Sequence, residues 1–528
     1  MAGGDRIGQR AHRLVVNVIS AGGSQGGILV ASLVVTPVLV AGLGLTRYGL
    51  WALVGVLVNY FGLLDLGVGS SFVRFLAYHH ARGDAEKFNS VVRIGLLFYA
   101  AFAAVLLPAV CVFRGTIVSA LGVAPELRRE VTFLIVGVSV IFALRSLFIV
   151  YRSAIAAVER LDVNNRIALM IALPNALGAI LVVQLGLGLE GLVYNGLATA
   201  ALTIAAQIFA AHRLIGMLSL RPFRVDWSVG PELLGFGLRV QATRGAELIN
   251  GHADKLILGF LVGAASVGLY DLGMKLSLLA AALPTLLLPA VAPTSAVLEA
   301  QGDGAQLEAL HDRATKYVAL ALAPATAFVL VAAPSLLRVW IGPRDLDLAA
   351  ATARLLVIGA APLLALGVSR LVARGIGLPQ MEMKASVVLA GVNLALSIFL
   401  VRRFGPLGAP LGTACSGLLA AILFLGSFRK KIAGRFDFDP IRSLTVPTVA
   451  AAFAAAAGLG GCVAARMWDL PGGRTGALVE MLFIAVPFGL VYLAGVMRTS
   501  VLDEYDQRVA RETWAIARAA FGRSGAES

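Results

Sequence analysis

The stretch LVVNVISAGGSQGGILVASLVVTPVLVAGLGL, from Leu14 to Leu45, contains no Asp, Glu, Lys or Arg. About 20 mostly apolar residues in a helix are enough to cross the hydrocarbon core of a bilayer, so this run predicts a membrane span. Arg6, Arg10 and Arg13 precede it. A cleaved signal peptide has a shorter apolar core and a small-residue cleavage site, so we expect this span to be retained.

The rest of the chain has the same apolar character. Its 528 residues are 59% hydrophobic and 14% charged, with a mean hydropathy of +0.86. Soluble globular proteins have about 45–50% apolar and about 25% charged residues. The fold class is therefore expected to be an all-α polytopic membrane protein. The net charge of +14 is expected in cytoplasmic loops, where basic residues fix topology, rather than in a nucleic-acid site.

Roughly fourteen stretches are long and apolar enough to be spans. Their centres are Val30, Val58, Ala101, Val140, Gly178, Ala201, Ile249, Leu279, Ala327, Pro362, Val392, Leu418, Ala454 and Pro487. With the N-terminus inside, most loop Lys and Arg residues fall on the cytoplasmic side, including the cluster from Arg429 to Arg435. The pairs Arg128-Arg129 and Arg402-Arg403 oppose this trend. The balance predicts that both termini are cytoplasmic.

An internal repeat organises these spans. Six pairs of similar residues occur in the same order, 217 to 223 positions apart. The pairs are Gly49 with Gly268, Asp84 with Asp303, Arg93 with Lys316, Arg152 with Arg370, Arg166 with Lys384, and Gly188 with Gly405. An even number of spans in each half predicts a parallel repeat, which is a common plan of secondary transporters.

The repeat predicts two pseudo-symmetric six-helix bundles plus two extra C-terminal helices. The expected domains are an N-terminal bundle at 1–215, a cytoplasmic linker at 216–230, a C-terminal bundle at 231–430, two additional helices at 431–500 and a cytoplasmic tail at 501–528.

The sequence lacks the short motifs of an ATP motor or an enzyme. There is no GxxxxGK[ST], HExxH or CxxC, so we expect no catalytic residues, no cofactor and no metal site. A membrane enzyme such as a glycan polymerase needs an aqueous loop that holds an acid and a base. The longest outer connections, Arg114–Glu130 and Arg466–Arg474, are short and contain no histidine. A transporter is the better interpretation.

Charges inside spans are costly in lipid and are candidate functional residues. The seventh span places five polar side chains within one arc of a helix turning about 100° per residue. They are Arg239, Thr243, Glu247, Asn250 and Asp254. This face lines a solvent-filled cavity or forms an internal salt-bridge seam, in which Glu247 pairs with Arg244 or Arg239.

Other charges also lie within spans. Asp65 lies beside Gly62 and Gly69 in the second span, where a structural ion pair or hydrogen bond competes with a substrate contact. Arg145 lies in the middle of the fourth span and Lys275 early in the eighth. The interior charges are mostly basic, which suits an anionic solute such as a pyrophosphate or an acidic sugar.

The candidate site residues form two groups. The substrate-binding candidates are Arg239, Arg244, Lys275, Arg145 and Asn250. The candidates for ion coupling or for a structural charge are Glu247, Asp254 and Asp65.

Several motifs carry a family resemblance over nearly the whole chain. They are Tyr48-Gly-Leu-Trp51, Leu64-Asp-Leu-Gly67 followed by Arg74, Ala253-Asp-Lys-Leu-Ile-Leu-Gly259, Val267-Gly-Leu-Tyr270 and Leu283-Pro284. With the expected span count, they resemble the multidrug and oligosaccharidyl-lipid exporter (MATE-like) superfamily. Within it, the chain is similar to the Wzx-type polysaccharide transporters, also called oligosaccharide flippases.

This resemblance implies a function. An undecaprenyl-pyrophosphate-linked sugar repeat unit would be flipped across the bacterial cytoplasmic (inner) membrane by alternating access, with its headgroup in a charged cavity. The implied partners are that lipid-linked glycan, membrane lipids, and a glycan polymerase or glycosyltransferases, with H+ or Na+ as coupling ion.

Two relatives are alternatives within the superfamily. Lipid II flippases carry arginines in the first span, whereas this span has no charge after Arg13. The drug-extruding branch often uses an acid in the first or seventh span. Because Glu247 and Asp254 lie in the seventh, a cation-coupled multidrug antiporter is the second hypothesis.

Overall fold

A computed structural model describes most of the chain. The described residues are 2–62, 68–219, 221, 225–227, 251–286, 288–432, 440–468, 470–499, 501 and 506, with backbone alone for 2–22, 68, 70 and 440. All regular elements in these ranges are helices. The expected all-α class is confirmed.

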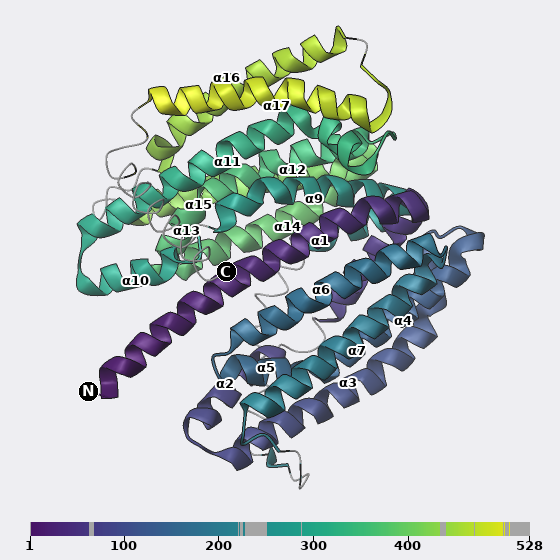
Figure 1. Cartoon of the computed structure of the whole chain (residues 1–528), viewed down its shortest axis with the longest axis vertical. Helices are drawn as coiled ribbons and strands as arrows, with labels where there is room; N and C mark the ends of the chain where they lie inside the picture. Colours follow the sequence, from purple (N-terminus) through teal and green to yellow (C-terminus); the bar gives the residue numbers. More distant parts are fainter. Residues whose placement is uncertain are drawn as a thin grey trace, which may run out of the picture. The chain divides into compact units, whose positions relative to one another are not determined.

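Contacts divide the chain into two compact units. Unit 1 consists of Met1–Leu272 with Leu389–Thr413, and unit 2 of Gly273–Val388 with Ala414–Ser528. The helices of unit 1 are α1 (Ala2–Phe61), α2 (Val68–Ala81), α3 (Ala85–Ala120), α4 (Arg128–Leu147), α5 (Ile149–Ala157), α6 (Leu161–Gln184) and α7 (Gly188–Leu214), with an unlabelled helix at 251–261 (Figure 1). Those of unit 2 are α10 (Val291–Gln301), α11 (Gly304–Ile341), α12 (Asp347–Ala365), α13 (Gly367–Gly375), α16 (Pro440–Arg466) and α17 (Gly473–Arg498). Residues of α9 (Ala264–Leu286), α14 (Pro379–Phe404) and α15 (Gly408–Ile432) belong to both units.

Eleven segments of the described chain are long and apolar enough to cross a membrane. One of them, 379–432, contains both α14 and α15. The spans expected around Val58 and Ile249 include residues outside the described ranges, so the count of fourteen stays a prediction. The chain is a multi-pass membrane protein.

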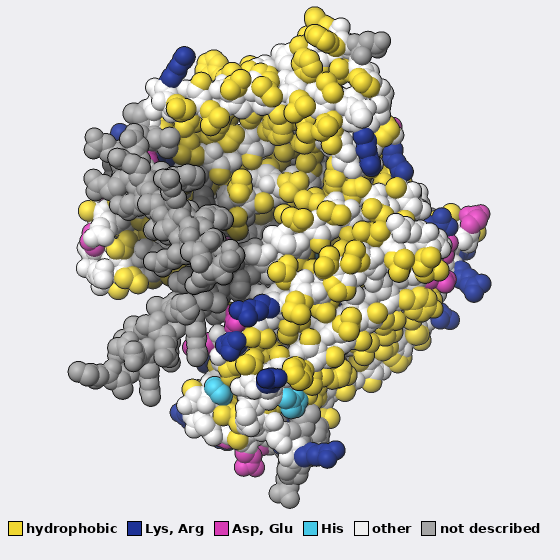
Figure 2. All heavy atoms as spheres, viewed as in Figure 1, with side chains coloured by type: hydrophobic (Ala, Val, Ile, Leu, Met, Phe, Trp, Pro, Cys, Tyr) yellow, Lys and Arg dark blue, Asp and Glu magenta, His cyan; other side chains and the backbone are white. Residues whose placement is uncertain are grey.

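The outer sides of the helices are apolar, as a bilayer requires. On α6, Leu173, Leu177 and Leu181 follow one another at four-residue spacing, and each is more than half exposed. Figure 2 shows hydrophobic side chains over the sides of the helices, with charged side chains toward helix ends. Apolar side chains also fill the interior, where Phe72, Phe88 and Tyr99 form part of the core of unit 1.

Matching local structures appear at the spacing of the sequence repeat. Gly83 and Gly302 both have positive φ, 68° and 70°, where a side chain would be strained. The next residues, Asp84 and Asp303, each accept a hydrogen bond from a backbone N–H three residues later and so begin α3 and α11.

The same spacing relates two helix breaks. The helical path is interrupted at Phe148, between α4 and α5, and at Leu366, between α12 and α13. After the first break, Asn164 donates to the carbonyl of Arg152 at 3.0 Å. After the second, Arg370 donates to Glu382 at 2.9 Å. A hydrogen bond therefore connects the equivalent pair of positions in each half of the repeat, 152 with 164 and 370 with 382.

Candidate functional site

The structure describes three of the eight predicted site residues. Asp65, Arg239, Arg244, Glu247 and Asn250 lie outside the described residues, so the cavity and the salt-bridge seam stay open hypotheses. Arg145 is exposed in the last turn of α4, with no hydrogen bond or ion pair to any residue that the structure describes. Lys275 is half-buried on α9 in unit 2. Asp254 is buried in unit 1 within a polar cluster.

The cluster adjoins a helix crossing made by two glycines of the repeat. α1 changes direction at Gly44 (φ 75°) and then crosses α9. A Cβ atom on Gly49 would lie 1.8 Å from the carbonyl oxygen of Ala264, and one on Gly268 would lie 2.8 Å from that of Leu45. Only glycine permits so close an approach of the two backbones. Gly49 and Gly268 are the first pair of the sequence repeat.

Charged side chains flank this crossing. Lys255, on the helix at 251–261, is paired with Asp271 of α9 at 2.5 Å, and both are buried. Tyr48, directly before Gly49, donates its hydroxyl hydrogen to the other oxygen of Asp271. Burying an ion pair stabilises only if its remaining lone pairs are satisfied. The tyrosine satisfies one of them.

Asp254 has a different environment. Its carboxylate accepts hydrogen bonds from Tyr270 at 2.7 Å, from Ser397 at 2.9 Å and from Thr413. Ser397 lies on α14 and Thr413 on α15, so residues about 150 positions away in sequence complete the cluster. No Lys, Arg or His among the described residues forms an ion pair with Asp254. A buried carboxylate balanced only by hydroxyl groups can take up a cation or a proton.

The cluster has more acceptor oxygens than hydrogens. The Ser397 hydroxyl lies 2.9 Å from the Asn393 side-chain oxygen and 3.4 Å from the Ala409 carbonyl, in addition to Asp254. The Thr413 hydroxyl lies 3.2 Å from the same Asn393 oxygen. Each hydroxyl has a single hydrogen to donate. Carboxylate, amide and hydroxyl oxygens such as these are the ligands that a hard cation prefers.

One carboxylate in this oxygen set matches one positive charge. The arrangement therefore fits a monovalent cation such as Na+, or a proton on Asp254.

Sequence reasoning selected Asp254 but not its partners. Ser397, Thr413 and Asn393 are single polar residues in apolar spans, and such residues are common in membrane helices. The sequence could have indicated Asp271 as a site residue, because an acid within an apolar span is costly unless it has a partner.

These features define a class of protein. Multiple apolar spans, a repeat whose halves meet at a glycine crossing, and buried ionisable groups within spans are the attributes of a membrane transporter. The sequence profile of the family described as "Polysaccharide biosynthesis protein" matches residues 31–349. The chain belongs to this family. The profile described as "Lipid II flippase MurJ" matches residues 265–470.

Relatives and solved structures agree with this assignment. The uncharacterized membrane protein EpsK of Bacillus subtilis (strain 168) is 24% identical over 433 residues, which are 79% of this chain and 83% of EpsK. The inward closed conformation of the lipid II flippase MurJ has a TM-score of 0.68 at 14% identity and covers 91% of this chain and 98% of MurJ. An inward-facing MATE multidrug transporter of the MOP superfamily has a TM-score of 0.59 at 16% identity, covering 76% and 94%. The expected superfamily fold is confirmed.

Proposed function

We propose that this protein flips a lipid-linked oligosaccharide across the bacterial cytoplasmic membrane for polysaccharide export. The cargo is a repeat unit on undecaprenyl pyrophosphate. The observation that carries this proposal is the family match over residues 31–349, which include Gly49, Gly268 and the residues Asp254, Lys255 and Asp271 of the buried polar site. The flippase profile over 265–470 and the likeness to the MurJ fold support a lipid-linked cargo rather than a soluble one.

Alternating access is the mechanism that the repeat supports. The crossing at Gly49 and Gly268 joins helices from the two halves of the repeat through backbone contact. Because the two glycines have no side chains that interdigitate, the helices can separate at this contact without repacking side chains. With cytoplasmic termini, as the loop charges predict, this crossing lies toward the outer surface. Its closure corresponds to a state in which the outer path is shut.

The Asp254 cluster is the proposed coupling site. Na+ would be held by the Asp254 carboxylate together with the Asn393, Ser397 and Thr413 oxygens, whereas a proton would neutralise only the carboxylate. Several oxygen atoms around one carboxylate favour Na+. The gradient of this ion would drive the return of the empty transporter.

A cation-coupled multidrug antiporter is the second candidate. The MATE transporter fold and the buried acid on the seventh span favour it. The interior charges expected here are mainly basic, and these favour an anionic cargo. The match to the polysaccharide biosynthesis family favours the glycan.

A genetic experiment tests the proposed function. Deletion of the gene should abolish surface polysaccharide and leave lipid-linked repeat units on the cytoplasmic side, and the wild-type gene should restore export. Arg239→Ala, Arg244→Ala and Lys275→Ala should each reduce export if the basic residues bind the pyrophosphate. Normal export by all three variants at normal membrane abundance would exclude the cationic binding cavity. Normal export in the deletion strain would exclude the function itself.

A further inference from the structure

Unit 2 contains a polar pocket of its own. It lies where α11 ends and where the chain turns from α16 into α17, and its volume is about 510 Å³. The loop charges predict that this end of unit 2 is extracytoplasmic. The residues that define its chemistry are Arg338, Arg466, Trp468, Gly472, Gly476 and Glu480.

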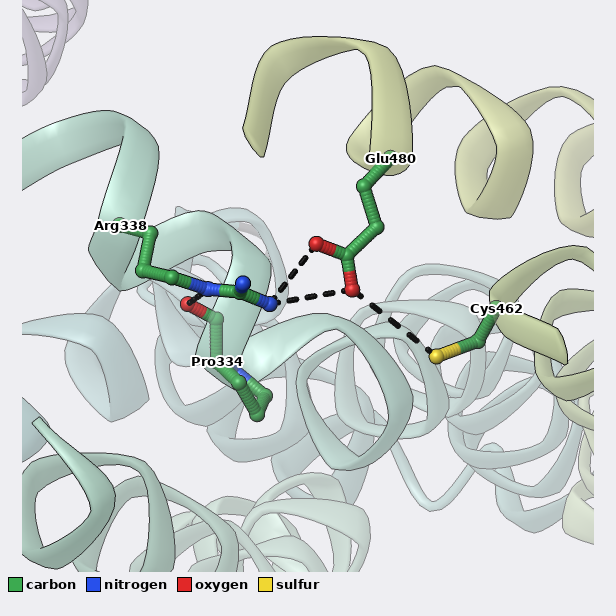
Figure 3. A network of polar contacts seen from close by, with 4 residues as sticks. All are labelled: Pro334, Arg338, Cys462 and Glu480. Carbon is green, nitrogen blue, oxygen red and sulfur yellow. Dashed lines mark hydrogen bonds and ion pairs between the residues drawn. The ribbon is translucent and has the colours of Figure 1, made fainter. Parts of the chain in front are cut away.

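An ion pair forms one wall of the pocket. Arg338 of α11 donates from Nη2 to both carboxylate oxygens of Glu480 on α17, at 3.0 and 2.7 Å (Figure 3). The Cys462 thiol of α16 lies 4.0 Å from the same carboxylate, and Arg338 Nε donates to the Pro334 carbonyl at 3.4 Å. This network joins three helices and leaves the charge of Glu480 neutralised.

A second arginine gives the pocket an excess of positive charge. Arg466, in the last turn of α16, is exposed and forms no hydrogen bond or ion pair with any described residue. Among the described lining residues there are thus two arginines and one glutamate, with a net charge of one positive unit. An arginine without a partner on a concave surface is free to donate two parallel hydrogen bonds to a phosphate.

The start of α17 adds to the positive potential. The helix is capped by Gly472 with no side-chain hydrogen bond, so its first amides lack side-chain acceptors. Gly472, Gly473 and Gly476 line the pocket without side chains that would keep a ligand away from the backbone. A helix N-terminus attracts anions through these amides and its dipole.

The surroundings of the pocket are apolar. Trp468 lines it and is 67% exposed, which suits an indole ring at the level of lipid headgroups. On the adjoining faces, Val463 of α16 and Leu482 of α17 are each more than half exposed. A ligand with an anionic head and a hydrocarbon tail would match both environments.

We propose that this pocket binds the phosphate group of a lipid. Arg466 and the first amides of α17 hold the phosphate oxygens, and Arg338 borders the phosphate group. The lipid tail lies along α16 and α17. An anionic phospholipid of the bilayer and a polyprenyl phosphate offer the same phosphate ester. The proposal does not depend on the identity of the transported substrate.

Native mass spectrometry of the full chain in detergent tests this proposal. The probes are phosphatidylglycerol, undecaprenyl phosphate and, as the phosphate-free lipid, diacylglycerol. Arg466→Gln should weaken binding of one or both phosphate lipids by about five- to tenfold. Arg466→Lys, which keeps the charge but not the planar fork, should weaken it less. The matched control is Arg442→Gln, because Arg442 is exposed at the other end of α16 without a described partner.

The pattern of loss identifies the source of the phosphate. If Arg466→Gln weakens the binding of phosphatidylglycerol, the ligand is a bilayer phospholipid. If it weakens the binding of undecaprenyl phosphate alone, the ligand is a polyprenyl lipid. Unchanged binding of both lipids to Arg466→Gln would overturn the proposal. An equal loss of phosphate-lipid binding in Arg442→Gln would also overturn it. So would diacylglycerol that binds as tightly as the phosphate lipids and is weakened as much by Arg466→Gln. Melting temperatures of the variants separate a lost contact from a lost fold.

Discussion

Gly49 and Gly268 face each other across the crossing of α1 and α9, with a built Cβ of Gly49 only 3.0 Å from the backbone nitrogen of Gly268. These glycines occupy equivalent positions in the two halves of the repeat. The close contact therefore joins the halves at matching points, which is the geometry expected near an axis of pseudo-symmetry.

Adding a methyl group at this crossing should be damaging. Gly49→Ala would place a Cβ 1.8 Å from the Ala264 carbonyl, which is backbone and cannot rotate away. Overpacking of this kind costs about 1–3 kcal/mol. The matched control is Gly55→Ala on the same helix, because no atom lies within 4 Å of its built Cβ. Thermal unfolding should show a lower melting temperature for Gly49→Ala alone. Equal melting of both variants would contradict the contact.

Asp254 should determine the response to sodium. At a Na+ concentration ten times Kd, binding to the folded state stabilises the wild type by about 1.4 kcal/mol relative to choline. Asp254→Asn should abolish this effect because it removes the negative charge. Ser295→Ala should retain it, since the one hydrogen bond that the Ser295 hydroxyl forms with a described residue, the Val291 carbonyl, lies within α10. If the wild type responds to pH but not to Na+, the coupling ion is the proton.

Replacing only Asp271 of the Lys255–Asp271 pair should lower the free energy of unfolding more than replacing both residues. Asp271→Asn leaves a buried ammonium without its counter-charge, which costs about 3–5 kcal/mol. The double variant Lys255→Met with Asp271→Leu removes both charges and should recover part of this loss. Denaturation in detergent and membrane abundance measure the difference. A double variant less stable than Asp271→Asn would show that the pair itself stabilises the fold.

Glu480 should secure α17 to α11. Glu480→Gln should lower stability by about 1–2 kcal/mol, since the carboxylate is largely buried although Arg338 is partly exposed. A cycle with Arg338→Gln should give a coupling energy of roughly 1 kcal/mol. Arg374→Gln serves as the control, because Arg374 is 55% exposed in its pair with Glu382 and should contribute under about 1 kcal/mol. If the losses of stability in Arg338→Gln and Glu480→Gln simply add in the double variant, the two side chains do not stabilise the fold as an ion pair.

Much of the fold follows from local sequence signals. Apolar length predicts helices that cross a bilayer, and the spacing of Gly49 from Gly268 and of Asp84 from Asp303 predicts two related halves. The structure adds the helix breaks at Phe148 and Leu366. No glycine or proline immediately precedes Phe148, so the sequence carries no breaker signal there.

The site was less accessible to prediction. Asp254 stands out as an acid in a span, but its contacts with Ser397 and Thr413 depend on the packing of α14 and α15. The close approach of these helices at Gly412, whose built Cβ would lie 2.5 Å from the Ser397 hydroxyl, cannot be derived from spacing alone. The stripe from Arg239 to Asn250 stays a prediction.

Translocation in reconstituted vesicles tests the central claim most directly. Vesicles contain the purified protein and an undecaprenyl-pyrophosphate-linked oligosaccharide, and a membrane-impermeant glycosidase first removes all glycan from the outer leaflet. The account predicts that glycan from the inner leaflet then becomes sensitive to the enzyme much faster than in protein-free vesicles. A rate equal to that of protein-free vesicles, in vesicles where the same protein transports a cationic dye, would contradict glycan flipping and establish the drug antiporter.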